Sequence, residues 1–407
     1  MKRTVRFLIA PLIATASLVG CNTSQSDSKE REVSDSTQLS AETLALGITS
    51  VPPQLTHTYS KALKFDRYTK VTAPNGEAIH IVSQDGLSDN QIVRARSILQ
   101  HYLKDYPGSM YGADKSEVAN KMADNGAILL LLNGKDDGSN PAAELNGQPL
   151  YHDEIQVEGG DWYIQQNYEH RDASFEEILH LVHDTGIGID QGGTAGALPA
   201  YQAQIRRAQV VALSNNLWGI GEENQAWIAE LSEENSLTQE YLASVIDAYY
   251  GLWGAWSESN THSMWGIYVA KTRAEISSED RLGAELMDHK FFHPYLTYNA
   301  RIDASFNGDF SLKYDSDKPY THHSQYLKDV TLTGANNSNV IVNQYDNHIT
   351  GNSGVNKVFF SGKASEYSIT TSDDGQTTVV DGVDKRDGRN VLVGVEQLGF
   401  IDSVVSL

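Results

Sequence analysis

Residues 174–184, with the sequence SFEEILHLVHD, carry the pattern that decides the fold around them. Apolar side chains recur at positions i, i+3, i+4 and i+7 of this stretch, namely Phe175, Ile178, Leu179 and Val182. This spacing is typical of an amphipathic helix whose apolar side faces a core. At about 100° per residue, potential metal ligands share another face of the same helix. That face holds Glu176, His180, His183 and Asp184.

The same stretch also admits an interpretation without a metal. Ser174 and Glu177 have the spacing of a capping box, in which each side chain bonds the backbone near the helix start. Acidic residues in the first turn also favour the helix dipole. The spacing ExxxHxxH is less specific than a complete HExxH motif, which would carry histidine in place of Glu176. The residues alone therefore leave both a metal site and an ordinary helix start open.

A resemblance to a known family extends over a larger part of the chain. Residues 176–187, EEILHLVHDTGI, resemble the HEFAHxIHxxGL helix of a group of secreted zincin-type metallopeptidases distantly akin to anthrax lethal factor. Residues 239–251, QEYLASVIDAYYG, are similar to the EYFAEGVQAYF helix of that family. Residues 126–130 and 272–275 resemble its Gly-Ala-apolar strand and its TREEL segment. The matches span about residues 90–290, and they imply a zincin-like α+β domain.

The resemblance also implies a zinc site and a role for each matching residue. It makes His180 a metal ligand, Glu177 the general base that acts on a zinc-bound water, and Glu240 the third ligand from the second helix. Glu176 stands where the family has histidine. Zinc accepts carboxylate oxygen, so the remaining ligand is either Glu176 or His183, one turn further along.

Two functions follow and stay alternatives. The first is a zinc metallopeptidase-like hydrolase with a degenerate site, acting on a peptide or protein substrate. The second is a non-catalytic surface binding or adhesion protein. Ser244 replaces the second glutamate of the family's EYFAE motif, and Glu176 replaces a histidine. Two departures at functional positions are what a non-catalytic relative would show.

A region of different character begins near residue 303. Residues 333–359 divide into three units of nine residues, whose eighth position is always apolar: Val340, Ile349 and Val358. A period of nine with Gly and Asn turns predicts a parallel β-roll. The units resemble the hemolysin-type calcium repeat, most clearly in residues 351–359. The resemblance implies an all-β roll with a capping hairpin over residues 303–407.

The calcium ligands of such a repeat are only partly present. The sixth position, which should carry a carboxylate, holds Ser338, Asn347 or Asn356, and Asp346 is the one acidic residue of the three units. Calcium prefers carboxylates, and neutral amide oxygens alone bind it weakly. Two interpretations stay open, a weak calcium site at Asp346, Asn347 and Asn356, and a calcium-poor roll held together by asparagine ladders.

Other segments have simpler patterns. Residues 78–82 and 127–132 predict strands, and residues 89–106 predict a helix. Residues 366–370 and 377–380 flank an Asp-Asp-Gly turn and predict a hairpin. We assign the pair His322 and His323 to the junction before the repeats rather than to the metal site.

The N-terminus has the pattern of an exported lipoprotein. A basic start and an apolar run lead to residues 18–21, LVGC, which resemble the bacterial lipobox. That resemblance implies cleavage before Cys21 and lipid attachment to its thiol, whereas the plainer interpretation is a free structural cysteine. Asn22 replaces the Asp associated with inner-membrane retention, which favours the outer membrane, facing the periplasm or the cell surface.

Composition sets the remaining limits. Residues 1–20 are expected to be a signal peptide, residues 21–57 a disordered tether rich in Ser, Thr and acids, and residues 58–302 the zincin-like domain. A single cysteine excludes an intrachain disulfide. The formal net charge of −22 disfavours nucleic acid as a partner and suits cations. The two family resemblances imply zinc and calcium as the cofactors.

Overall fold

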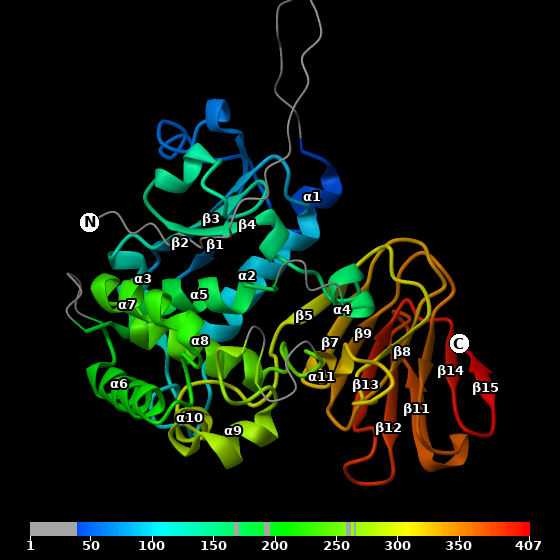
Figure 1. Cartoon of the computed structure of the whole chain (residues 1–407). Helices are drawn as coiled ribbons and strands as arrows, with labels where there is room; N and C mark the ends of the chain where they lie inside the picture. Colours follow the sequence, from blue (N-terminus) through cyan, green and yellow to red (C-terminus); the bar gives the residue numbers. More distant parts are fainter. Residues whose placement is uncertain (1–38, 167–170, 191–195, 258–261, 264–265) are drawn as a thin grey trace, which may run out of the picture.

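The computed structural model describes residues 39–166, 171–190, 196–257, 262–263 and 266–407. A mixed α/β region with a helical middle comes first, and a C-terminal region made mostly of strands follows it (Figure 1). The expected signal peptide, Cys21 and residues 22–38 lie outside the described residues. None of the helices in the described ranges is long and apolar enough to cross a membrane.

The first region contains a four-stranded sheet in the order β1-β2-β3-β4. Its strands are β1 (Phe65–Thr72), β2 (Ala78–Gln84), β3 (Ile128–Leu132) and β4 (Gln148–Tyr151). β1 and β2 are antiparallel, whereas β2, β3 and β4 run parallel. Every residue of β3 is buried, as expected for a continuous apolar run at the centre of a sheet. The strands predicted at residues 78–82 and 127–132 are confirmed.

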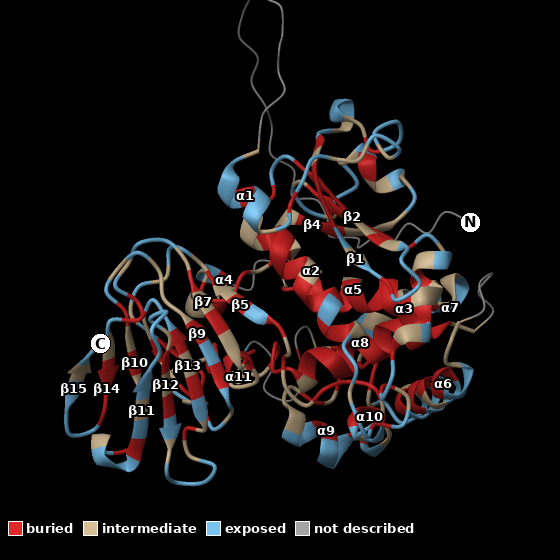
Figure 2. Cartoon of the chain, turned by 180° about the vertical axis from the view of Figure 1, so that it is seen from behind, coloured by how far each residue is buried: buried red, intermediate tan, exposed pale blue. Residues whose placement is uncertain are grey.

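Helices cover this sheet and form the middle of the chain. They are α2 (Asp89–Leu103), α3 (Ser116–Asp124), α4 (Asp161–Gln165), α5 (Ser174–Val182), α6 (Pro199–Ser214), α7 (Gln225–Glu234), α8 (Leu237–Tyr249), α9 (Arg273–Glu279) and α10 (Arg281–Met287). α5 packs against α2, α8 and the edge strand β4. Figure 2 shows the buried residues concentrated along α2, α5 and α8. The helix predicted at residues 89–106 is confirmed as α2, which begins with a capping box between Ser88 and Gln91.

The helix predicted from residues 174–184 is α5 followed by one π-helical turn (His183–Ile187). Its predicted apolar face is confirmed, because Phe175, Ile178, Leu179 and Val182 are fully buried. The capping box between Ser174 and Glu177 does not form, since the helix is capped at Ala173 without a side-chain hydrogen bond. The Glu177 carboxylate instead accepts a hydrogen bond from Gln148 on β4.

The structure describes residues 39–57 of the tether predicted at residues 21–57, and this part is held on the domain. The short helix α1 (Ala41–Ala45) is capped by Ser40, whose hydroxyl accepts a hydrogen bond from the Thr43 amide. Ile48 is completely buried, and Thr49 forms an isolated bridge with Tyr68 of β1. One apolar side chain and one backbone bridge hold this segment on the domain, a contact that composition alone does not reveal.

The C-terminal region consists mostly of two mixed sheets. One has the order β15-β14-β10-β8-β6 and contains β6 (Asp309–Ser311), β8 (Asn339–Ile341), β10 (Lys357–Phe359), β14 (Gln397–Gly399) and β15 (Val404–Ser406). The other has the order β11-β12-β13-β9-β7-β5 and contains β5 (Asn299–Ile302), β7 (Asp329–Leu332), β9 (Asn347–Thr350), β11 (Tyr367–Thr371), β12 (Thr377–Asp381) and β13 (Arg389–Val393). Because β5 belongs to the second sheet, this region begins at residue 299, before the predicted boundary at 303.

Successive strands from β5 to β10 alternate between the two sheets, and neighbouring strands among them are parallel. Val340 of β8 lies beside Val358 of β10, while Ile349, midway between them in sequence, belongs to the other sheet. All three side chains are buried. Each nine-residue unit therefore supplies one strand with one inward apolar residue. The predicted hairpin is also confirmed, as the antiparallel pair β11 and β12.

Candidate metal centre

Two adjacent helices bring three potential metal ligands together. Glu176 and His180 lie one turn apart on α5, and Glu240 projects from the first turn of α8. One ligand atom from each residue lies within 4.8 Å of the others, and all three residues are buried. We call these residues the Glu-His-Glu group. No other group of three His, Cys, Asp or Glu residues with this proximity occurs among the described residues.

The Glu-His-Glu group fits a divalent cation. His180 Nε2 lies 3.7 Å from Glu240 Oε1, and this ring nitrogen has no hydrogen-bond partner. Two ligands about 2.1 Å from a tetrahedral zinc ion are roughly 3.4 Å apart, close to the separation found here. One imidazole nitrogen and two carboxylates also form a donor set that zinc accepts. The three residues could hold a metal ion, and their geometry does not specify which one.

The protonation of the group reflects its burial and its excess of acids. Burial raises the pKa of Glu240 to about 8, with further repulsion from Glu176 and partial compensation from His180. Burial alone would lower the pKa of His180, but Glu240 and Glu177 outweigh it and raise this pKa to about 9. Without a metal, the group therefore retains protons near neutral pH that a bound cation would displace.

The side chain of Arg171 places a positive charge beside this group. Its guanidinium forms an ion pair with Glu176, and both side chains are largely buried. Burial acts to lower the pKa of Arg171, but Glu176, Asp247 and Glu240 together outweigh it and raise the pKa. Glu176, at the position where the resemblance predicts histidine, is therefore paired with an arginine, which the sequence did not point to.

Glu177, the predicted general base, lies beside the Glu-His-Glu group. Its Oε2 accepts a 2.6 Å hydrogen bond from Gln148 Nε2 at the start of the edge strand β4. The same oxygen is 3.5 Å from His180 Nδ1. Glu177 is less buried than the three ligands, with 15% of its side chain exposed. It therefore stands between the edge of the sheet and the buried group, where a carboxylate can exchange protons with solvent.

His183, the other candidate for the replaced ligand, points elsewhere. It is fully buried, and its Nε2 lies 2.6 Å from Gln202 Oε1 on α6. Burial lowers the pKa of His183 to about 4, so the ring is neutral at physiological pH. Of the two alternatives from the sequence, the structure brings Glu176, not His183, to His180 and Glu240.

Asp247 is a buried acid that the sequence analysis missed. It lies two turns after Glu240 on α8, is 1% exposed, and neither carboxylate oxygen has a hydrogen-bond partner. Burial raises the pKa of Asp247 well above its usual value, and repulsion from Glu176 raises it further. The spacing i, i+7 from Glu240 was the available signal, because it places both acids on one face of the helix. Ser244, between them, accepts a hydrogen bond from Trp218 Nε1.

The residues predicted for calcium take part mainly in contacts within the protein. Asn356 Nδ2 donates to Ser338 O and to Asn352 Oδ1, while its Oδ1 accepts from the Asn352 amide. Asn347 Nδ2 donates to Lys328 O and to Asn343 Oδ1. The bonds to Ser338 O and Lys328 O link successive turns of the chain through backbone carbonyls, whereas each Asn–Asn bond lies within one turn. Asp346 is tied to the neighbouring strand by the Arg389 amide.

A second buried set of charges lies close to the start of α5. Arg94 Nε is 3.1 Å from Glu158 Oε2, and Arg94 Nη2 is 2.7 Å from Asp172 Oδ2. Tyr163 donates to Asp172, and Tyr298 donates to Glu158. Burial would raise the pKa of Glu158, but Arg94 outweighs it and lowers this pKa to about 2. We call these five residues the paired cluster.

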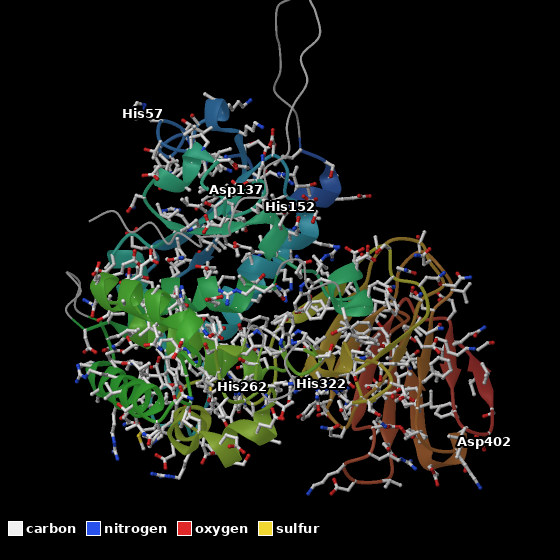
Figure 3. All side chains as sticks on the ribbon, in the orientation of Figure 1. His57, Asp137, His152, His262, His322 and Asp402 are labelled. Carbon is white, nitrogen blue, oxygen red and sulfur yellow. The ribbon has the colours of Figure 1, made fainter. Side chains whose placement is uncertain are left out.

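The histidine pair assigned to the junction lies on α11 (Thr321–Ser324), between the helical region and the strands. His323 Nδ1 is 2.8 Å from Tyr250 O at the end of α8, and its Nε2 is 3.6 Å from Glu158. His322, labelled in Figure 3, lies where the two regions meet, with its ring 5.0 Å from that of Tyr314. Neither residue belongs to the Glu-His-Glu group.

Comparison with protein-family models, with curated proteins and with solved structures gives no match for this chain. The case for a function therefore depends on the buried groups themselves.

Proposed function

We propose that the protein is a metal-dependent hydrolase of the metallopeptidase type, acting on peptides or proteins. The observation that carries the proposal is the buried Glu-His-Glu group, in which His180 Nε2 has no hydrogen-bond partner and faces Glu240 at 3.7 Å. Buried polar atoms are nearly always satisfied, so an unpartnered ring nitrogen beside carboxylates supports a cation-binding role for this group. Zinc is the metal that this donor set suits best.

The surrounding residues would have distinct roles. His180, Glu240 and Glu176 would hold the metal, which when bound would polarise a scissile carbonyl and a water molecule. Glu177 would accept the proton from the attacking water and pass it to the leaving amine. Gln148 would orient the Glu177 carboxylate through the hydrogen bond from Nε2. For Glu176 to bind metal, the Arg171 guanidinium would have to share or release that carboxylate.

The test combines metal analysis with peptide hydrolysis. We expect the purified full-length protein to bind about one equivalent of Zn²⁺ and to cleave an unstructured protein such as casein. Glu177→Gln should keep the metal and lose at least about a hundredfold in turnover, the usual range for a general base. Asp153→Asn, a change of a partly exposed acid outside the group, is the matched control. The enzyme proposal would be wrong if the protein bound no zinc and if the wild-type protein and Glu177→Gln were equally inactive.

The second candidate is a non-catalytic surface binding protein. The observation that favours it is the ion pair between Arg171 and Glu176, because a guanidinium already neutralises the carboxylate that a metal would need. Glu176→His would restore the ligand of the zincin family. A gain of zinc binding and hydrolysis in that variant supports the hydrolase, whereas no response supports the binding protein.

For the C-terminal region, we propose a β-roll of the hemolysin type. The alternation of parallel strands between two sheets and the nine-residue spacing of Val340, Ile349 and Val358 support it. The asparagine contacts favour a roll that is stable without calcium. A weak calcium site at Asp346 and its neighbours stays a prediction, which calcium titration of the full-length protein would test.

For localisation, we propose a lipoprotein anchored through Cys21 in the outer membrane. The lipobox-like residues 18–21 support this proposal. Cys21→Ser should release the protein from the membrane fraction, and mass spectrometry of the mature N-terminus should show the lipid mass. An unmodified Cys21 in a retained signal segment would contradict it.

A further inference from the structure

A pocket of about 610 Å³ opens where the helical region meets the C-terminal sheets. One wall is the face of α2 that carries Val93, Ser97, Gln100, His101 and Lys104. The opposite wall is formed by residues 297–299 and by side chains of β5 and β7. Junctions between structural units are common positions for small-molecule sites, and this volume suits a metabolite-sized ligand.

The lining of this pocket has the opposite charge from the rest of the molecule. The chain has a formal net charge of −22, yet the lining contains Lys104 and Arg301 and no Asp or Glu. His101 adds no charge, because burial and nearby lysines lower its pKa well below the usual value. Its ring is held by Thr297 and Tyr250. The pocket is therefore a local cationic site on an acidic protein.

The two cations retain groups that a ligand can use. Arg301 Nε donates to Asn90 Oδ1, which fixes the guanidinium and leaves its two terminal nitrogens for another acceptor. Lys104 is exposed, and no hydrogen bond among the described residues involves its Nζ. The neutral donors Ser97, Gln100 and Asn299 surround them. A fixed guanidinium edge with a mobile ammonium is well matched to a carboxylate or a phosphate.

We propose that this pocket binds a small anionic ligand through carboxylate or phosphate oxygens, with Arg301 as the planar anchor and Lys104 as the second charge. The site is separate from the Glu-His-Glu group and does not depend on a metal or on hydrolysis. Its position between α2 and β5 means that an occupant would contact both regions of the molecule.

The experiment is calorimetric titration of the full-length protein with succinate and, separately, with inorganic phosphate, at an ionic strength of about 0.15 M. At that ionic strength, charges more than about 8 Å away are largely screened, so the general acidity of the protein has little influence. Arg301→Gln and Lys104→Gln should each weaken binding about tenfold, since each removes a charge-assisted hydrogen bond. Lys70→Gln, on an exposed part of β1, should leave the affinity unchanged.

The two titrations also separate the ligand classes. Tighter binding of succinate assigns the pocket to carboxylates, and tighter binding of phosphate assigns it to phosphorylated compounds. Binding of neither anion at millimolar concentration overturns the proposal. It is equally overturned if Arg301→Gln, Lys104→Gln and Lys70→Gln all bind like the wild-type protein. Thermal unfolding of each variant, compared with wild type, shows whether a lost affinity comes from lost folding.

Discussion

The two buried charged groups of the helical region are equally hidden from solvent but differ in how they are satisfied. In the paired cluster, all four carboxylate oxygens of Glu158 and Asp172 accept hydrogen bonds from protein donors. In and beside the Glu-His-Glu group, His180 Nε2 and both oxygens of Asp247 have no hydrogen-bond partner. The first pattern is that of a structural ion network. The second is the pattern expected of the proposed metal site.

Proximity makes the contrast more informative. Asp172 of the paired cluster precedes α5 by two residues, and its Oδ1 accepts a hydrogen bond from the Ser174 amide. The satisfied cluster therefore fixes the start of the helix that carries Glu176 and His180. A rigid, fully paired support next to an unsatisfied group is the arrangement that a preorganised site requires. Four changes test whether the two groups differ as this comparison requires.

The largest expected effect comes from removing the cation of the paired cluster. Arg94→Met should lower the free energy of unfolding by about 3–5 kcal/mol, because it leaves two buried carboxylates without a counter-charge. Urea denaturation of the full-length protein measures the loss. Arg206→Met is the control, because Arg206 is half exposed and forms an ion pair with Asp190. Its loss should lower the free energy of unfolding by less than about 1 kcal/mol. Equal losses for the two variants would show that the paired cluster does not stabilise the fold.

The next effect is specific to the Glu-His-Glu group. Zinc at about 100 times its dissociation constant should stabilise the wild-type protein by about 2.7 kcal/mol, because only the folded chain holds the ligands together. Glu240→Gln should lose most of this gain. Glu154→Gln changes a partly buried acid outside the group, whose pKa desolvation raises to about 8, and should retain it. Thermal unfolding with and without zinc measures all three. An equal zinc response in both variants would place the metal elsewhere.

Local periodicity predicted the parts of this site that lie on helices. The spacing of Phe175, Ile178, Leu179 and Val182 gave the orientation of α5, and the structure buries all four. Glu240 on the second helix was implied only by the resemblance to the metallopeptidase family, and the structure brings it together with Glu176 and His180 of α5. The strand pattern of the nine-residue units was predictable for the same reason, because each unit contributes its own inward side chain.

The remaining features depend on contacts between distant segments. Arg171 reaches Glu176 from the loop before α5, and Gln148 reaches Glu177 from a sheet edge. No periodic pattern in the sequence predicts either contact. His183 has the helical spacing expected of a metal ligand. The helix becomes π-helical at this residue, however, and the His183 ring is hydrogen-bonded to Gln202 of α6. Helical spacing gives the face of a side chain, and tertiary packing decides its partner.

A smaller effect is expected from a single hydrogen bond of the paired cluster. Tyr298→Phe removes the 2.6 Å bond from its hydroxyl to Glu158 Oε1 without changing the shape of the ring. A hydrogen bond to a buried charged acceptor is worth about 2 kcal/mol. Tyr106→Phe removes a bond to the exposed His289 and should cost under about 1 kcal/mol. Urea denaturation measures both losses. If the two variants lose the same free energy of unfolding, the hydrogen bond from Tyr298 to Glu158 does not stabilise the paired cluster as the comparison requires.

The smallest expected effect is a change in pH dependence at Asp247. Burial raises its pKa in the folded protein, while the unfolded chain titrates near 3.8. Between these values the folded state binds the extra proton, so wild-type stability falls as pH rises. Asp247→Asn removes this term, so its stability relative to wild type should increase from pH 5 to pH 6, by up to about 1.4 kcal/mol for one proton. A change in the free energy of unfolding that the new amide causes equally at both pH values cancels in this difference.

Denaturation of metal-free protein at both pH values measures that slope, and Asp172→Asn is the comparison within the paired cluster. Asp172 forms an ion pair with Arg94, so its replacement should weaken the protein at both pH values instead of strengthening it as pH rises. A flat difference between wild type and Asp247→Asn would mean that Asp247 is ionised in the folded protein and has a cation of its own. The Glu-His-Glu group would then have a satisfied neighbour, and the contrast between the two buried groups would rest on His180 alone.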